Sequence, residues 1–225
     1  MTPIEPIVLL LTPFALLGST YLAFHFLVRL WGPRFGYLAG FLFYWIVWGL
    51  LLPWWLVGRA GLAAMFRVPP EPFGEPAWIG VAFLLFPLAL GYGYAFPKAV
   101  RQVSFQVILF SALIAIVNGT LEEVLWRGTY LQVFPNSWFL GLVYPAFGFA
   151  VWHFAPQSIH PNRAPGGNLS LVLIAWMIAL LWGYVAKVSG SILLPVISHI
   201  LFDFSGLGAR IYFPKAPRVD STKVS

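Results

Sequence analysis

Residues 168–186 read NLSLVLIAWMIALLWGYVA, a run that contains no charged side chain. At about 1.5 Å of rise per residue, a helix of roughly 20 residues crosses the hydrocarbon core of a bilayer. Three more uncharged runs of similar length occupy residues 7–28, 35–57 and 77–96. These four runs predict transmembrane helices.

Three further stretches, 102–134, 137–155 and 188–209, keep the apolar background but contain charged residues or histidine. Prolines interrupt several of the runs, and membrane helices tolerate proline when neighbouring groups satisfy the freed carbonyls. The predicted fold class is therefore all-α, a polytopic membrane helix bundle of about seven transmembrane helices.

The composition agrees with this fold class. The 225 residues are 60% hydrophobic and only 9% charged, which excludes an ordinary soluble domain. The longest linker, 58–76, contains the proline-rich sequence RVPPEPFGEP and is too short to bury a core of its own. Residues 1–225 are predicted to form a single integral membrane domain with a short basic tail at 211–225. Because the chain has no cysteine, disulfides, thiolate nucleophiles and cysteine-ligated metals are excluded.

The net charge of +6 is explained by the membrane and requires no nucleic acid partner. Basic residues collect at helix ends, and cytoplasmic loops carry an excess of lysine and arginine. In a seven-helix topology, the larger group faces the cytoplasm and comprises Arg29, Arg34, Lys98, Arg101, Arg163, Arg210, Lys215, Arg218 and Lys223; the opposite group comprises Arg59, Arg67 and Lys187. This predicts a protein of the cell (plasma) membrane with the N-terminus outside and the C-terminus in the cytoplasm.

Three acids and one arginine lie inside the predicted spans: Glu122, Glu123, Asp203 and Arg127. An ionised residue at the centre of a membrane helix costs about 2.5–3.5 kcal/mol on insertion scales. Four such residues without partners would cost on the order of 10 kcal/mol, comparable to the whole stability of a domain. These residues must therefore be paired, face a wet cavity, or both.

The depths of three polar residues allow them to meet. Counted from the outer helix ends, Glu122, His153 and His199 lie at roughly 18, 24 and 14 Å, which is one layer near the membrane midplane. One polar site built from three helices is therefore feasible.

Helical spacing divides the residues of the first polar helix. Glu123 and Arg127 are four residues apart and can form an ion pair on one face. Glu122 is turned by about 100° from Glu123 and cannot share that pair equally, so it is the acid left for chemistry. Asn118 lies one turn before Glu122 on the same face.

Two more pairs have the same spacing. His199 and Asp203 lie four residues apart in SHILFDF and can present a joint polar face on the last helix. In FAVWHF, Phe149 lies one turn before His153 and can form a wall of the site beside it.

These residues resemble the three motifs of a known family. Glu122, Glu123 and Arg127 match EExxxR, Phe149 and His153 match FxxxH, and His199 and Asp203 match HxxxN/D. Each motif alone is common, but together and in this order they are similar to the CAAX protease and bacteriocin-processing family (CPBP, or Abi) of intramembrane glutamic endopeptidases. The resemblance covers about residues 100–210.

The resemblance implies hydrolysis of a peptide bond near the membrane, without a metal or other cofactor. By position, Glu122 would be the general base and His153 its partner in activating water, while His199 and Asp203 would stabilise the oxyanion. Glu123 and Arg127 would hold the helix in place. Family members often have asparagine where this chain has Asp203, so this aspartate is either protonated or orients His199. The implied substrate is a membrane-associated protein or peptide.

Alternatives from other classes remain at this stage. Glu122, His153, His199 and Asp203 are all competent zinc ligands, although the chain has no HExxH motif. A proton-coupled transporter or channel would also use buried Glu, His and Asp, but it does not explain the order of the three motifs. A structural polar core is the third alternative. Within the family reading, the sequence does not choose among prenylated CAAX proteins, bacteriocin or pheromone processing, and self-immunity.

Overall fold

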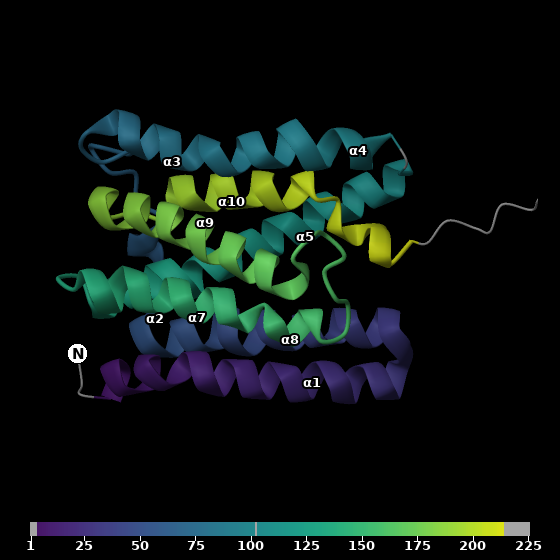
Figure 1. The fold of residues 1–225 in the computed structure, drawn as a ribbon. Helices are drawn as coiled ribbons and strands as arrows, with labels where there is room; N and C mark the ends of the chain where they lie inside the picture. The colour runs from purple at the N-terminus through teal and green to yellow at the C-terminus, as the bar shows by residue number, and fades with distance from the viewer. Residues whose placement is uncertain (1–3, 102, 214–225) are drawn as a thin grey trace, which may run out of the picture.

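The computed structural model describes residues 4–101 and 103–213, and every regular element in this part of the chain is helical (Figure 1). The elements are α1 (Ile4–Phe43), η1 (Tyr44–Leu51), α2 (Leu52–Met65), α3 (Ala77–Leu90), η2 (Gly91–Ala95), α4 (Phe96–Val100), α5 (Phe105–Glu123), η3 (Val124–Thr129), α6 (Tyr130–Val133), η4 (Phe139–Val143), α7 (Tyr144–Trp152), α8 (Phe154–Gln157), α9 (Gly167–Ser189), α10 (Leu193–Ser205) and η5 (Gly208–Ile211). Elements η1 to η4 are π-helical turns, and η5 is a 3-10 helix. The predicted all-α class is confirmed.

Five helical runs in the described residues are long and apolar enough to cross a membrane: Ile4–Met65, Ala77–Val100, Phe105–Val133, Phe139–Gln157 and Gly167–Ser189. The chain is thus an integral membrane protein, but the predicted number of seven spans is not confirmed. Two expected spans lie within the single run Ile4–Met65. The last expected span contains α10, whose 13 residues are fewer than the roughly 20 that cross a bilayer.

The run Ile4–Met65 is bent back on itself at Gly32. This glycine has φ 78° and ψ 169°, and Pro33 follows it. A residue before proline is driven out of the helical region, and only glycine takes this positive φ without strain. Residues about equally far from the bend pack together: Gly40 lies against the ring of Phe24, whose centroid is 5.3 Å from that of Phe41. The two expected spans therefore form an antiparallel hairpin (Figure 1).

The linker expected at 58–76 is shorter in the structure. Gly58 takes a positive φ of 65° and bends the chain, but the helix continues to Met65. The sequence after Gly58 contains no proline before residue 69 and is rich in alanine, so nothing stops the helix earlier. The described residues end at residue 213. Lys215, Arg218 and Lys223, which are predicted to lie on the cytoplasmic side, are therefore outside the described residues.

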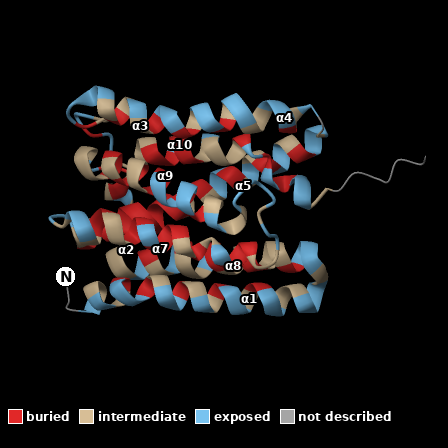
Figure 2. Ribbon diagram, in the orientation of Figure 1, coloured by how far each residue is buried: buried red, intermediate tan, exposed pale blue. Residues whose placement is uncertain are grey.

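The bundle exposes apolar residues on its outer surface and encloses polar ones. Figure 2 shows exposed residues along the outward faces of α1 and α3 and buried residues where the helices meet. Large side chains such as Phe14, Trp78 and Phe105 are exposed, whereas Glu122 and His199 are buried. Such a surface is suited to the hydrocarbon core of a membrane, because apolar side chains that contact lipid tails cost no free energy there.

The contact between α5 and α10 positions the polar centre. Helix α10 packs against α3, α5 and α9. At Gly119 of α5, an added Cβ would meet the backbone nitrogen of Ile200 at 3.0 Å and its Cα at 3.2 Å. Small residues allow such close approach of membrane helices. Glu122 and Glu123 therefore come within reach of the facing helix α10.

Gly119→Val should destabilise the protein, because the added methyl groups press against the backbone of α10. Overpacking typically costs about 1–3 kcal/mol, which for a chain of this size lowers Tm by roughly 2–12 °C. Thermal unfolding in detergent measures the effect. Gly93→Val is the matched control, since a Cβ at Gly93 meets nothing within 4 Å. An equal loss of Tm in both variants would contradict the proposed contact.

Candidate active site

The two adjacent glutamates lie where α5 ends and a π-helical turn begins. Glu122 and Glu123 are the last residues of α5, and Arg127 lies in η3. The wider turn is supported by the Thr129 hydroxyl, which donates to the Val124 carbonyl at 2.8 Å. Such π turns are rare and often occur at functional sites. All three charged side chains are at most 2% exposed.

Glu123 pairs with two cationic or polar groups. Its Oε1 lies 3.0 Å from Arg127 Nη1 and accepts a hydrogen bond of 2.8 Å from His199 Nδ1. The guanidinium of Arg127 also lies over the rings of Phe149, at 4.6 Å, and Trp182, at 5.6 Å. The predicted ion pair between Glu123 and Arg127 is therefore present, and it extends to the last helix.

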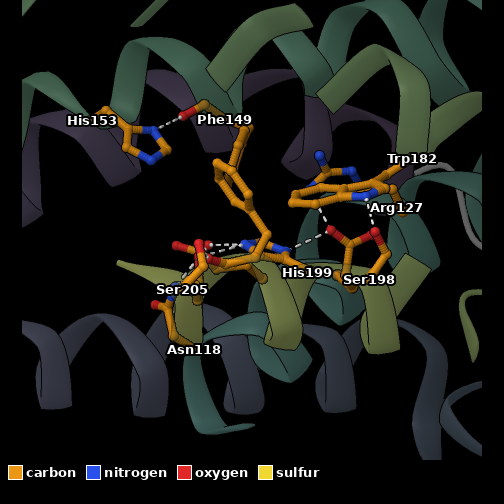
Figure 3. A network of polar contacts seen from close by, with 12 residues as sticks. Asn118, Arg127, Phe149, His153, Trp182, Ser198, His199 and Ser205 are labelled. Carbon is orange, nitrogen blue, oxygen red and sulfur yellow. Dashed lines mark hydrogen bonds and ion pairs between the residues drawn. The ribbon is translucent and has the colours of Figure 1, made fainter. Parts of the chain in front are cut away.

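The other nitrogen of His199 faces the remaining acids. Its Nε2 lies 3.3 Å from Glu122 Oε2 and 3.5 Å from Asp203 Oδ1. The Asn118 amide donates to Glu122 Oε2 at 3.0 Å and to Asp203 Oδ2 at 2.8 Å, and its oxygen accepts from Trp45 Nε1 at 2.9 Å. Asn118, Glu122, His199 and Asp203 thus form one connected cluster. Figure 3 shows Asn118 and His199 in this network.

Hydrogen bonding fixes the number of protons that the cluster needs. Because Glu123 accepts from Nδ1–H, a hydrogen bond at Nε2 of His199 needs one more proton: Nε2 donates if this proton is on the ring, and Nε2 accepts if it is on Glu122 or Asp203. With all three acids ionised, Arg127 and a charged His199 leave one negative charge uncompensated. One proton in addition to that on the charged His199 would make the group neutral, which is the less costly state in an apolar bundle.

The ring of His199 is held in place by Trp182. The two rings stack with centroids 4.2 Å apart and an interplanar angle of 25°. Trp182 Nε1 donates to Ser198 Oγ at 2.9 Å, and that hydroxyl donates to the Leu84 carbonyl at 2.8 Å. Three helices, α3, α9 and α10, therefore fix the orientation of this imidazole.

His153 lies at a break between α7 and α8. Its backbone nitrogen bonds to the Ala150 carbonyl at 3.2 Å, so the Phe149 carbonyl is free to accept from His153 Nδ1 at 2.8 Å. A carbonyl only accepts, so Nδ1 carries the hydrogen. In a neutral ring, Nε2 then has a free lone pair. In that state, this half-buried histidine can accept a hydrogen bond at Nε2.

His153 is near the cluster but is not hydrogen-bonded to it. It interacts electrostatically with Glu122, Asp203 and His199, and no hydrogen bond between it and these residues is formed. Figure 3 shows the ring of His153 beside Phe149; in this view, Asn118 lies on the opposite side of the polar cluster. The ring of Phe149 lies 4.7 Å from that of His153 and 6.1 Å from that of His199, so it lies between the two histidines; its role as a wall of the site stays a prediction.

Sequence reasoning missed several residues that organise the site. Asn118 was recognised as a neighbour of Glu122, but its bridge to Asp203 depends on how closely α5 and α10 pack. A polar side chain in an apolar span was the available signal. Trp45 and Trp182 had no signal, because tryptophans are common in membrane helices and only the fold brings these two to the cluster.

A cavity of about 370 Å³ gives access to this cluster. Asn118 and Asp203 line it together with Phe41 and Trp45, and it extends to Tyr212 beyond η5. Within the cluster, Glu122 Oε1 is buried and has no hydrogen-bond partner. An unpartnered carboxylate oxygen in such a place is suited to bind a water.

Fold and site together define a membrane-embedded protein whose buried polar centre combines glutamates, histidines and an aspartate from separate helices. Residues 104–205 match the family described as "Type II CAAX prenyl endopeptidase Rce1-like". The resemblance inferred from the three motifs is therefore confirmed over this segment, and the family name describes peptide hydrolases. No curated protein and no solved structure matches the chain significantly.

Arg127→Met should strongly destabilise the protein, because it leaves Glu123 buried without its cation. Removing one partner of a buried ion pair costs about 3–5 kcal/mol. Thermal unfolding in detergent measures the loss, with membrane abundance as a second readout.

The double variant Glu123→Gln/Arg127→Met tests the cause. It removes both charges and keeps an oxygen that can accept from His199 Nδ1, so it should recover more than half of the lost stability. If the double variant is as unstable as Arg127→Met alone, the ion pair is not the reason for the loss.

Proposed function

We propose that the protein is an intramembrane endopeptidase that cleaves a membrane-associated protein or peptide with a water activated by Glu122 and His153. The observation that carries this proposal is the buried cluster of Glu122, His199, Asp203 and Asn118, reached by a cavity of about 370 Å³. The match of residues 104–205 to a family of CAAX endopeptidases supports the same reaction class.

Glu122 and His153 supply two acceptors for the attacking water. Glu122 Oε1 has no partner, while Oε2 is held by Asn118 at 3.0 Å. His153 Nδ1 is committed to the Phe149 carbonyl, which leaves Nε2 as the acceptor of a neutral ring. A water that donates to both acceptors keeps its lone pairs free to attack the carbonyl carbon, and Glu122 takes the water's proton. Glu122 then gives this proton to the amine nitrogen as the C–N bond of the tetrahedral intermediate breaks.

His199 is the proposed donor to the oxyanion. Its contacts from Nε2 to Glu122 and Asp203, 3.3 and 3.5 Å, are longer than the usual 2.9–3.0 Å of such bonds. A substrate oxygen that gains negative charge can therefore compete for this proton. Donors held in a water-poor site stabilise developing charge better than donors in water. Glu123, Arg127 and Trp182 keep the ring in position, and Asp203 orients it from the cavity side.

The basic residues support an orientation of the protein in the membrane. The segments that carry the larger basic group, namely the bend of α1, α4, the segment after α8 and η5, gather at one end of the bundle (Figure 1). We assign this end of the bundle to the cytoplasmic side of the plasma membrane, which places the N-terminus outside the cell. CAAX-type maturation of prenylated proteins, processing of bacteriocins or pheromones, and self-immunity are the processes in which such an endopeptidase would act.

A zinc-dependent protease is the second candidate, and two observations favour it. Ligand atoms of Glu122, His199 and Asp203 lie within 4.8 Å of one another. His199 also donates from Nδ1 to Glu123, the arrangement in which a carboxylate supports a metal-bound histidine. In this candidate the three residues would hold the ion, and His153 would lie outside the ligand set.

Glu122→Gln should abolish cleavage, because an amide cannot take the proton of the attacking water. A loss of at least 10²-fold is expected from removal of a general base. The assay is cleavage of a membrane-tethered peptide library by the purified protein, followed by mass spectrometry. Glu75→Gln, a change in the loop between α2 and α3, is the matched control and should cleave like the wild type. Retained cleavage in Glu122→Gln would refute the assigned base.

A chelator separates the two candidate mechanisms. Cleavage by the wild type should survive prolonged treatment with a strong chelator. If cleavage is lost and returns with added zinc, Glu122, His199 and Asp203 are metal ligands. If the wild type cleaves no peptide at all, the protease proposal fails, and proton flux across vesicles is the next activity to measure.

Asp203→Asn should retain activity within a few-fold of the wild type. The amide oxygen of asparagine can still accept from Asn118, and its NH₂ group can donate to Glu122 or to the oxyanion. The same peptide assay measures the rate. A loss as large as that of Glu122→Gln would show that the negative charge at this position is required.

A further inference from the structure

A second hollow, of about 940 Å³, lies at the end of the bundle that contains the bend of α1. It is bounded by the start of α5 and by the segment from Gly206 to Phe213, and Arg34 reaches it from α1. We refer to this hollow as the outer basin, although it lies at the bundle end that we assign to the cytoplasmic side. It is distinct from the cavity at the cluster, because neither Asn118 nor Asp203 lines it.

The outer basin is positively charged. Arg34 and Arg210, which are far apart in the sequence, both line it, and none of the acidic residues in 4–101 and 103–213 does so. Both arginines are exposed, and within the described residues neither has a carboxylate within 4.0 Å. Gln106 adds a further hydrogen-bonding side chain. Burial raises the pKa of the Tyr212 hydroxyl above its ordinary value, so this group stays neutral and adds no negative charge.

An apolar groove lies beside this charge on the same helix. Trp31, Phe35, Leu38, Ala39 and Leu42 line a space of about 490 Å³ on the outer face of α1. Leu38 is four residues after Arg34, so the two share a helix face. The lining of the groove contains no charged side chain, and its only polar side-chain group is the indole N–H of Trp31, which suits the hydrocarbon chain of a lipid.

The structure assigns the outer basin as a binding site for the phosphate of an anionic phospholipid, with an acyl chain in the groove along α1. Basic pockets between transmembrane helices bind anionic headgroups, and the charge complementarity here comes from two arginines that have no acidic partner among the described residues. The combination of a cationic basin with an adjoining apolar groove favours a lipid over a free anion.

The bound lipid would lie against the wall of the catalytic cavity. Gly208, Ile211 and Tyr212 line both the outer basin and the cavity that reaches Asp203. The segment around η5 therefore separates the two spaces. The lipid site does not depend on the proposed proteolysis, since the arginines and the groove make it by themselves.

The test measures retention of phosphatidylglycerol by the full chain. The protein is equilibrated in mixed phosphatidylglycerol and phosphatidylcholine nanodiscs, and bound lipid is counted by native mass spectrometry after release. Arg34→Gln/Arg210→Gln should weaken retention of phosphatidylglycerol by roughly thirty-fold, since each basic residue near a membrane surface contributes to the attraction. Arg29→Gln/Arg163→Gln removes two charges from segments at the same end that do not line the basin and should retain the lipid within two-fold.

Each other outcome overturns the assignment. An equal loss in both double variants would mean that diffuse surface charge attracts the lipid. No selective retention of phosphatidylglycerol by the wild type would mean that the basin holds no lipid. Inorganic phosphate alone provides a further arm, because phosphate that binds the basin in detergent while the lipid is not retained would identify a free-anion site. Thermal unfolding of each variant verifies that the exposed substitutions leave the fold intact.

Discussion

The ion pair of Glu123 with Arg127, extended by the hydrogen bond from His199, is the interaction on which the rest of the structure depends. Charges inside a membrane bundle are tolerated when each has a partner and the partners are fixed. Glu123 Oε1 satisfies both conditions, at 3.0 Å from Arg127 Nη1 and 2.8 Å from His199 Nδ1. It therefore joins α5 to α10, and it leaves Glu122, one residue earlier, directed at the opposite nitrogen of the same imidazole.

The packing of small and aromatic residues makes this pairing possible. Gly119 allows the backbone of α10 to approach α5, and Trp182 of α9 stacks on His199 from the other side. At Gly32, a backbone conformation that favours glycine turns the first helical run back on itself and brings Trp45 to Asn118. The fold thus surrounds one polar cluster with apolar helices, and the cavity beside Asp203 connects that cluster to the bundle end near η5.

Much of the site could be predicted from the sequence because charge is scarce. In a chain with 9% charged residues, Glu122, Glu123, Arg127 and Asp203 inside apolar runs had to be paired, and their spacing predicted which faces they share. The structure pairs Glu123 with Arg127 and brings His199 to Glu122. The double engagement of His199 was not predictable, because it depends on the crossing of α5 and α10. Likewise, the tautomer of His153 follows from a local break that leaves the Phe149 carbonyl free, which periodicity does not reveal. The number of spans was not confirmed, since α10 is short and the first two expected spans are joined through Gly32.

The most direct measurement is an experimental structure of the purified wild-type protein at a resolution that shows ordered water, with anomalous scattering recorded at the zinc edge. We expect a water within hydrogen-bonding distance of Glu122 Oε1 and His153 Nε2, and no anomalous signal between Glu122, His199 and Asp203. A metal ion bound by these three residues, or a protein donor occupying Glu122 Oε1, would contradict this expectation.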